Sequence, residues 1–316
     1  MTRDLVLALS GGIGGAKLAL GLAQVVAPEN LLIVANTGDD FEHLGLSISP
    51  DIDTLTYALA GLDNQAMGWG RRDETWSFME TLGAVGGPTW FRLGDRDLAL
   101  HVERTRRLCA GQTLSAITAD LTRKLGVAPR VLPMSDDKVR TRVLSDDGWL
   151  DFQDYFVGQQ CKPVVRELAF IGAEAAAPHP DFLAALASPR LRAVVICPSN
   201  PFISVEPILA MPGVRTAICA CTAPVVAVSP IIGGKAVKGP TAKMMTELGI
   251  IPSAAAIARR YGDVLDGYVI DQQDAAEAEA LAMRTVLART LMTTLADKAA
   301  LARIVLDLAD SLHSST

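Results

Sequence analysis

The sequence is poor in aromatic residues and shows no excess of positive charge. Only 5% of the 316 residues are Phe, Trp or Tyr, and 29 basic residues stand against 35 acidic ones, giving a formal net charge of −6. A slightly acidic chain has no general attraction for nucleic acid or for an anionic membrane surface. We therefore expect no nucleic-acid partner and no membrane partner, so local groups must hold any bound phosphate.

Cysteine and long apolar runs are also scarce. The five cysteines are odd in number and lack metal-ligand spacing, which favours buried, reduced thiols and a cytoplasmic location. No apolar run approaches the length of a membrane span. The N-terminal apolar stretch follows an acidic residue and breaks into glycines, which is not typical of an export signal.

Half of the residues are hydrophobic, and apolar runs of strand length alternate with helical patterns. This alternation predicts one α/β domain over residues 1–316, with a Rossmann-like, mainly parallel sheet and helices on both of its faces. The predicted strands are Leu5–Leu9, Leu31–Ala35, Ala193–Cys197 and Val225–Ser229, and the predicted helices include Ala16–Val26 and Thr241–Leu248.

The middle of the chain has a different pattern. Two helices are predicted, over Asp95–Ala110 and Leu114–Leu125, with Thr113 placed to cap the second, so residues 92–126 form a small helical insertion. A turn at Ser145–Gly148 predicts a β-hairpin within residues 130–170. The amphipathic helix expected over Asp297–Leu312 covers the core.

The first strand runs into a glycine-rich loop that is followed by a helix. Glycines let backbone N–H groups approach a ligand, and a helix N-terminus favours anions, so the loop predicts a phosphate or diphosphate site. Lys17 stands where a dinucleotide fingerprint has its third glycine, and the Walker A neighbours of a lysine are missing. A plain NAD site or P-loop ATPase is therefore disfavoured, and a tight structural turn is the alternative; the candidate phosphate ligands are Gly11, Gly12, Gly14, Gly15 and Lys17.

Two acidic motifs follow. Asp39 and Asp40 come directly after the second strand, where they form either an exposed turn or a Mg²⁺ site. Asp51 and Asp53 precede the helical stretch Leu55–Ala60, and Asp53 or its neighbour Thr54 is a candidate N-cap. Four carboxylates near one sheet edge need a cation or a donor-rich ligand to compensate their repulsion.

Two polar loops follow later strands and should reach the same edge of the sheet. Ser199 and Asn200 lie in a stiff loop between prolines, and Asn200 offers an amide to a nucleobase or phosphate. Gly234, Lys235 and Lys238 lie in a glycine-flanked loop, where the lysines are either solvated or bound to a diphosphate.

Three of the four tryptophans gather in the segments Trp69–Trp76 and Trp90–Asp97, interleaved with arginines and acids. One interpretation is a packed junction with surface ion pairs. The other is a wall for a flat aromatic ligand, with Arg92 binding its polar groups.

Together, these residues resemble the 2-phospho-L-lactate transferase (CofD) family. The resemblance rests on an ordered set of short motifs over nearly the whole chain. They are Gly11–Lys17, Asn36–Asp40, Pro50–Thr54, Trp69-Gly70, Trp90–Asp97, Pro198–Pro201 and Ser229–Lys235.

The resemblance implies an enzyme of coenzyme F-420 biosynthesis. Such an enzyme transfers a phospholactyl-type group from a guanosine-diphosphate-linked donor to the deazaflavin Fo, releases GMP and requires Mg²⁺. It further implies that Asp53 and Arg92 bind Fo, that Asp39 of the Asp39–Asp40 pair binds the metal, and that the protein is a homodimer. Whether the transferred unit is lactyl, enolpyruvyl or phosphoglyceryl stays open.

The implied mechanism is phosphoryl-group transfer by positioning and charge. Asp53 would orient the attacking hydroxyl or accept its proton, and Lys235 or Lys238 would stabilise oxygen charge. One alternative is a non-catalytic CofD-like regulator that binds a nucleotide sugar. Such proteins should lack the two motifs that hold the deazaflavin, at residues 50–54 and 90–95, and both are present here. An NAD-dependent oxidoreductase is weakened by Lys17 and by Asn36 at the end of the second strand, where an acid is expected.

Overall fold

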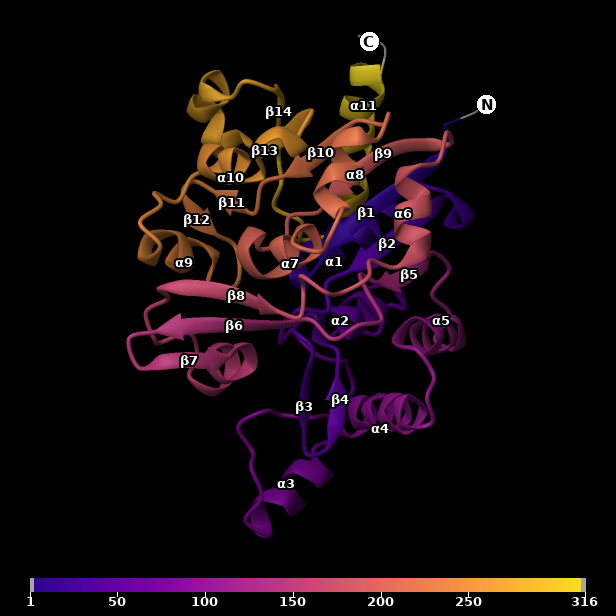
Figure 1. The fold of residues 1–316 in the computed structure, drawn as a ribbon, viewed down its shortest axis with the longest axis vertical. Coiled ribbons are helices and arrows are strands. Elements are labelled where there is room, and N and C mark those ends of the chain that lie inside the picture. Colours follow the sequence, from indigo (N-terminus) through magenta and orange to yellow (C-terminus); the bar gives the residue numbers. More distant parts are fainter. Residues whose placement is uncertain (1–2, 314–316) are drawn as a thin grey trace.

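A computed structural model describes residues 3–313 and has a seven-stranded parallel sheet at its centre (Figure 1). The order across the sheet is β14-β13-β10-β9-β1-β2-β5, and every neighbouring pair is parallel. These strands are β1 (Leu5–Ser10), β2 (Leu31–Ala35), β5 (Arg130–Pro133), β9 (Leu191–Ile196), β10 (Val225–Val228), β13 (Gly267–Asp271) and β14 (Arg284–Ala288).

The strand order reverses direction at one place. From β1 the chain adds β2 and β5 on one side, then returns to add β9, β10, β13 and β14 on the other. This doubly wound order confirms the predicted Rossmann-like sheet. Its switch point lies between β1 and β9, where such folds bind their ligands beyond the carboxyl ends of the strands.

Side chains of β1 alternate between two buried layers. Val6 and Ala8 belong to the core beneath α1 (Gly12–Leu22) and α11 (Leu295–His313). Leu7 and Leu9 belong to the opposite core, which helices such as α6 (Pro180–Leu186), α8 (Val214–Ala220) and α10 (Ala254–Tyr261) cover. A parallel sheet with both faces covered explains why its strands are continuous apolar runs rather than alternating ones.

Two predicted helix starts were wrong. The first helix, expected over Ala16–Val26, begins at Gly12 and ends at Leu22, because Gly11 is extended and the glycines after it enter the helix directly. The helix α2 (Pro50–Leu59) begins before Asp53, since proline suits a first helical position. Asp53 and Thr54 therefore lie inside the helix and cap nothing.

A lobe projects away from the sheet at the bottom of Figure 1. It contains the hairpin of β3 (Phe41–His43) and β4 (Leu46–Ile48), then α3 (Ser77–Ala84) and α4 (Asp95–Cys109). Its own buried cluster consists of only Ile48, Met79 and Leu93. The next helix, α5 (Leu114–Lys124), is capped by Thr113, as predicted.

A separate antiparallel sheet contains the predicted hairpin. Strands β6 (Arg140–Ser145) and β7 (Gly148–Asp151) form it, and β8 (Glu167–Ile171) adds a third strand on the other side of β6. The helix α9 (Thr241–Glu247) forms as predicted, after the short strands β11 (Ile231–Ile232) and β12 (Lys235–Ala236).

The five cysteines are free, but the expectation that they are buried was wrong for most of them. Cys197 is buried in the sheet, whereas Cys109 and Cys219 are exposed. Both exposed cysteines lie in the last turn of a helix, α4 and α8, where the chain reaches the surface.

Within residues 3–313, no single helix is both long enough and apolar enough to cross a membrane. The segments Pro201–Leu209 and Val214–Ala220 meet that requirement only as a pair, by length and composition, with a bend of 84° between them.

The close contact between α1 and α11 gives a test of the core packing. A Cβ on Gly21 of α1 would lie 2.1 Å from the carbonyl oxygen of Lys298 in α11, so the helices must separate to accept any side chain. We expect Gly21→Ala to lower the free energy of unfolding in urea by about 1–3 kcal/mol. Gly83→Ala in α3 is the matched control, because its Cβ would make an ordinary 3.4 Å contact with Thr89 and alanine favours a helix. Equal stability of the two variants would contradict the packing argument.

Candidate active site

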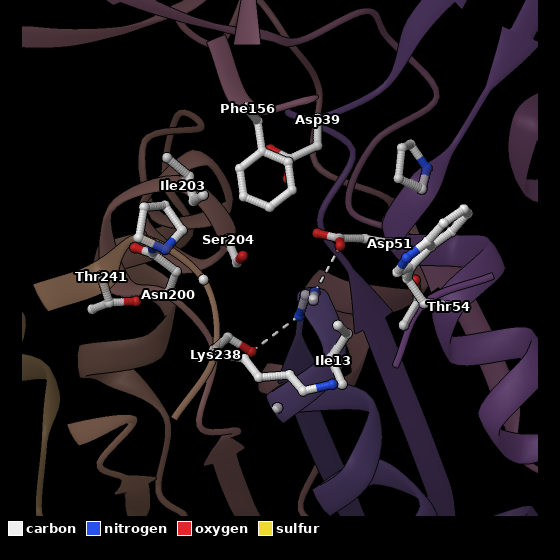
Figure 2. Close-up of a pocket in the computed structure, with 18 of the residues that line it drawn as sticks. Ile13, Asp39, Asp51, Thr54, Phe156, Asn200, Ile203, Ser204, Lys238 and Thr241 are labelled. Carbon is white, nitrogen blue, oxygen red and sulfur yellow. Dashed lines mark hydrogen bonds between the residues drawn. The ribbon is translucent and has the colours of Figure 1, made fainter. Parts of the chain in front are cut away.

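A cavity of about 740 Å³ lies at the switch point of the sheet. Its walls come from the β1–α1 loop, the first turns of α2, the loop after β9 and the loop before α9. Figure 2 shows Asn200 and Thr241 on one side of this pocket and Asp51 and Thr54 on the other. Its volume is within the range of small-molecule sites.

Most of the predicted site residues line this one pocket. Gly12 and Asn200 both do so, which confirms that the glycine loop and the Ser-Asn-Pro loop share an edge of the sheet. The full set of predicted residues in the lining is Gly11, Gly12, Gly14, Lys17, Asp39, Asp53, Arg92, Ser199, Asn200 and Lys238. Four predicted residues are not part of the lining, namely Gly15, Asp40, Gly234 and Lys235.

The glycine loop packs more tightly than a phosphate cradle alone would require. A Cβ on Gly14 would lie 2.3 Å from the carbonyl oxygen of Pro198, and one on Gly15 would lie 2.4 Å from Oγ of Ser199. A Cβ on Gly11 would similarly meet a carboxylate oxygen of Asp51 at 2.5 Å. Three of the four glycines therefore allow the β1–α1 loop to approach the neighbouring loop and α2.

Two backbone donors of this loop already have partners within the protein. Gly11 donates to Oγ of Ser199 at 3.1 Å, and Gly12 donates to Oδ1 of Asp51 at 2.7 Å (Figure 2). The N–H groups in the first turn of α1 have no partner within that helix, as at any helix start, and they follow directly after Gly12. The backbone N–H groups that could bind an anion are therefore those that follow Gly12 in the first turn of α1.

Two of the four clustered carboxylates accept hydrogen bonds from neutral groups. Asp51 accepts from the Gly12 N–H and, at 2.9 Å, from the side-chain amide of Asn36. Asp40 accepts from the hydroxyl of Ser49 at 2.8 Å. Burial still raises the pKa of Asp51 to about 6 and that of Asp40 to about 7.

Asp39 is the least compensated carboxylate of the cluster. Its Oδ1 is buried and has no hydrogen-bond partner among residues 3–313, and only 7% of the residue is exposed. Burial raises the pKa of Asp39 well above its usual range, and the charges of Asp51 and Asp40 raise it further. A buried carboxylate in such surroundings fits a site that receives a cation.

Asp53 is compensated by a buried arginine that the sequence argument missed. The guanidinium of Arg104 in α4 contacts both carboxylate oxygens of Asp53, and both side chains are buried. His101 lies beside this pair, and its other ring nitrogen faces Asp97. The available signal was spacing, since Asp97, His101 and Arg104 recur at intervals of four and three residues on one helix face.

The predicted lysines occupy different environments. Lys17 donates to the carbonyl oxygen of Met292 at 3.0 Å, and burial together with the nearby Lys238 lowers its pKa. Lys238 reaches across to Gly68, where a Cβ would lie 1.9 Å from its amine. Lys235 is exposed in β12, away from the pocket lining.

The tryptophan-rich segments form part of the pocket wall. Trp69, Trp90 and Arg92 all line it. The guanidinium of Arg92 lies 4.1 Å from the ring centre of Trp76, and the ring of Trp90 lies edge-on to His43 at 5.1 Å. These contacts hold the wall while leaving Trp69 and Trp90 partly exposed.

Two other parts of the lining could not be found from the sequence. Phe152 and Phe156 enter from the segment after β7, where their rings stack at 5.3 Å. Residues 290–292 enter from the loop after β14, a strand that the sequence analysis did not predict.

A doubly wound α/β fold with a pocket at its switch point is typical of proteins that bind a ligand at the carboxyl edge of the sheet. The family model for 2-phospho-L-lactate transferase CofD matches residues 6–304. The chain belongs to the CofD family and is a transferase of that type.

Two named relatives are similar in sequence to most of this chain, and a solved structure shares its fold. A phosphoenolpyruvate transferase of Streptomyces griseus is 42% identical, over 98% of this chain and 99% of its own length. One of Mycobacterium avium is 39% identical, over 95% and 96%. A crystal structure of a UPF0052-family protein from Bacillus halodurans has the same fold, with a TM-score of 0.65 and 16% identity, covering 97% of this chain and 99% of that one.

The raised pKa of Asp40 predicts how stability depends on pH. The folded state holds this proton more tightly than the unfolded chain does, because the pKa is about 7 in the fold and 3.8 ordinarily. The contribution of protonated Asp40 to the free energy of unfolding is therefore fully present below about pH 4 and is lost as the pH rises through 7. It amounts to about 1.4 kcal/mol for each unit of difference between the two pKa values. We expect Asp40→Asn, which can still accept from Ser49, to make the free energy of unfolding in EDTA fall less between pH 4.5 and 7.5.

The matched control is Asp73→Asn. Asp73 is exposed and has a φ of +58°, a conformation that asparagine tolerates. The control should follow the wild-type pH dependence. An Asp40→Asn protein that also follows it would show that Asp40 titrates in its ordinary range.

Proposed function

We propose that this protein transfers an enolpyruvyl phosphate group in coenzyme F-420 biosynthesis. The donor is a guanosine-diphosphate-linked molecule, and the acceptor is the terminal ribityl hydroxyl of the deazaflavin Fo. The hydroxyl oxygen forms a bond to the phosphorus that bears the enolpyruvyl group, the bond from that phosphorus to the oxygen of GMP breaks, GMP leaves, and the hydroxyl proton is released to solvent. The names of the relatives from Streptomyces and Mycobacterium support enolpyruvyl over lactyl or phosphoglyceryl as the transferred unit.

The observation that carries the proposal is that one cavity contains a buried carboxylate with an unpartnered oxygen (Asp39 Oδ1), a helix N-terminus and an aromatic wall. Asp39 by itself would account only for a cation site, and the N-terminus of α1 by itself would account only for an anion site. The wall of Trp69, Trp90 and Arg92 adds a surface for a planar molecule. A diphosphate donor and a deazaflavin acceptor use all three.

The residues present fit a divalent cation. Asp39 and Asp51 both extend into the pocket (Figure 2), and the charge of Asp51 raises the pKa of Asp39. Asp40 is bound to Ser49 and does not line the pocket. Asp39 with Asp51, rather than Asp39 with Asp40, would hold Mg²⁺, which neutralises charge on phosphate oxygens when bound.

The donor would lie in the pocket over the first turn of α1 and the loop after β9, which pack against each other. The first turn of α1 presents backbone donors and a partial positive charge to the diphosphate. Lys17 and Lys238 add positive charge at the same wall, a role expected earlier for Lys235 as well. Ser199 and Asn200 face the guanosine part from the other side.

The acceptor would lie against the tryptophan-rich wall. Arg92 donates hydrogen bonds to the polar edge of the deazaflavin, and Trp69 and Trp90 contact its ring. Asp53 accepts a hydrogen bond from the ribityl chain and orients the attacking hydroxyl. Each of these residues lines the cavity.

Fluorescence titration of Fo tests the acceptor site. We expect saturable binding to the wild-type protein and at least about tenfold weaker binding to Arg92→Ala, because a hydrogen bond from a charged donor is lost. Arg72→Ala is the matched control, since Arg72 is exposed and pairs only with Asp73 at 3.7 Å. The alternative, a regulator that binds a nucleotide sugar, predicts no saturable Fo signal in any of these proteins.

GMP release from the donor in the presence of Fo tests the reaction and its metal. We expect turnover to require Mg²⁺, to stop in excess EDTA and to be nearly abolished by Asp39→Asn. Asp40→Asn should be milder, because Asp40 lies outside the pocket lining. Full activity of Asp39→Asn, or of the wild-type protein in EDTA, would remove the metal from the mechanism.

A further inference from the structure

We propose that Arg104 is a positioning residue for the acceptor, because it holds the carboxylate of Asp53 in one orientation at the pocket wall. The inference rests on the proposed function, in which Asp53 binds the ribityl chain of the deazaflavin. It adds a residue from a different part of the chain, which lies behind the wall rather than in it.

The geometry of the pair is that of a fixed fork. One terminal nitrogen of Arg104 donates to Oδ2 of Asp53 at 3.1 Å, and the other contacts Oδ1. Only about 2% of the Arg104 side chain is exposed, and it is among the largest fully buried side chains. A bidentate arginine leaves a carboxylate little freedom to rotate, because both oxygens are bound at once.

A second layer holds Arg104 and the wall together. The guanidinium lies 3.2 Å from Nδ1 of His101, and since arginine has only donors, that nitrogen must accept. The ring proton is then on Nε2, which lies 3.2 Å from Asp97, and Asp97 also accepts from the hydroxyl of Tyr57. Tyr57 lies one helical turn after Asp53 on α2, so this series of contacts leads from Arg104 back to the helix that carries Asp53.

The position of each group relative to the pocket separates binding from positioning. Asp53, Tyr57, Asp97 and His101 all line the cavity, whereas Arg104 does not. A ligand can therefore contact Asp53 directly, whereas Arg104 can affect the ligand only through the orientation of Asp53. This distinguishes Arg104 from Arg92, which lines the pocket itself.

The same residues invite a different interpretation, which the charges disfavour. Oxygen and nitrogen atoms of Asp53, Asp97 and His101 lie within 4.8 Å of one another, close enough for a metal site. The guanidinium of Arg104 already supplies the positive charge that such a site would need, and it contacts both oxygens of Asp53. The unpartnered carboxylate oxygen of the pocket belongs instead to Asp39.

A purely structural role for Arg104 is the other alternative. The ion pair between Arg104 and Asp53 joins α4 of the projecting lobe to α2, which packs beside the sheet. The lobe has only a small core of its own. An arginine that served only this purpose would affect stability and both substrates alike. An arginine that orients Asp53 would affect the acceptor selectively.

The test is Arg104→Lys, which keeps the charge but cannot form the two-pronged contact. In the full-length protein we expect the KM for Fo and the dissociation constant from Fo fluorescence to rise at least about tenfold. The KM for the donor should change less than about twofold, because the donor lies on the other side of the pocket. In an Asp53→Asn background, Arg104→Lys should change the KM for Fo less than about twofold, since the carboxylate that it positions is gone.

The control is Arg107→Lys on the same helix. Arg107 pairs with Asp120 at 2.7 Å and is not part of the pocket lining, so both KM values should match the wild type. Thermal melting shows whether each variant is folded. If Arg104→Lys does not fold, Arg104→Gln replaces it and should show the same selective rise, because a single uncharged amide cannot bind both carboxylate oxygens of Asp53.

Four results would overturn the inference. A folded Arg104→Lys protein with wild-type Fo affinity shows that Asp53 does not depend on this arginine. Equal losses for donor and acceptor, or equal losses with and without Asp53, assign Arg104 to stability alone. A wild-type protein with no saturable Fo signal removes the proposed function and this inference together, whereas a normal wild-type signal with an unaffected variant removes the inference only.

Discussion

The burial of four carboxylates at one edge of the sheet is the constraint on which the rest of this site depends. Asp39, Asp40, Asp51 and Asp53 are each no more than 7% exposed. Each ionised group must find compensation, because an unpaired buried charge is far too costly to persist. Asp51 and Asp53 are compensated by hydrogen bonds or an ion pair, whereas Asp39 and Asp40 each retain one oxygen without a hydrogen-bond partner within residues 3–313, and of these two only Asp39 lines the pocket.

The groups that contact these carboxylates account for much of the local structure. Gly11 must lack a side chain because Asp51 approaches its backbone, and the backbone N–H of Gly12 is then spent on Asp51. The pairing of Asp53 with Arg104 requires α4 to lie against α2, which fixes the projecting lobe beside the pocket. The aromatic wall belongs to that lobe. The ion pair between Asp53 of α2 and Arg104 therefore also positions the aromatic wall, which we assign to the planar acceptor.

The sequence predicted the sheet and the edge at which the site lies, but not how the carboxylates are paired. Strands such as Leu31–Ala35 are buried on both faces, so their apolar runs and the polar residues after them are visible in the chain itself. Short strands such as β5, or β14 with its partly exposed face, lack that pattern and were missed. The partner of Asp53 lies 51 residues away, and only tertiary packing brings Arg104 to it. The sequence likewise does not show that Asp40, predicted as a metal ligand with Asp39, accepts a hydrogen bond from Ser49 and lies outside the pocket lining.

The glycine loop shows why a motif can predict the right place for partly the wrong reason. Gly11, Gly12 and Gly14 line the pocket, yet Gly14 and Gly15 are needed where α1 meets the loop after β9. Close packing and phosphate binding both demand glycine, and a sequence alone cannot separate them. In the mechanism that we propose, the first helical turn of α1, rather than the whole loop, would therefore hold the diphosphate.

The central claim is that Asp39 receives a cation beside the diphosphate. Crystals soaked with Mn²⁺ and guanosine diphosphate test it most directly, since Mn²⁺ replaces Mg²⁺ at oxygen ligands and can be located by its anomalous scattering. The account predicts a peak against the carboxylates of Asp39 and Asp51 that disappears in Asp39→Asn. A peak at Asp53, Asp97 and His101 instead, or an unchanged peak in Asp39→Asn, would contradict it.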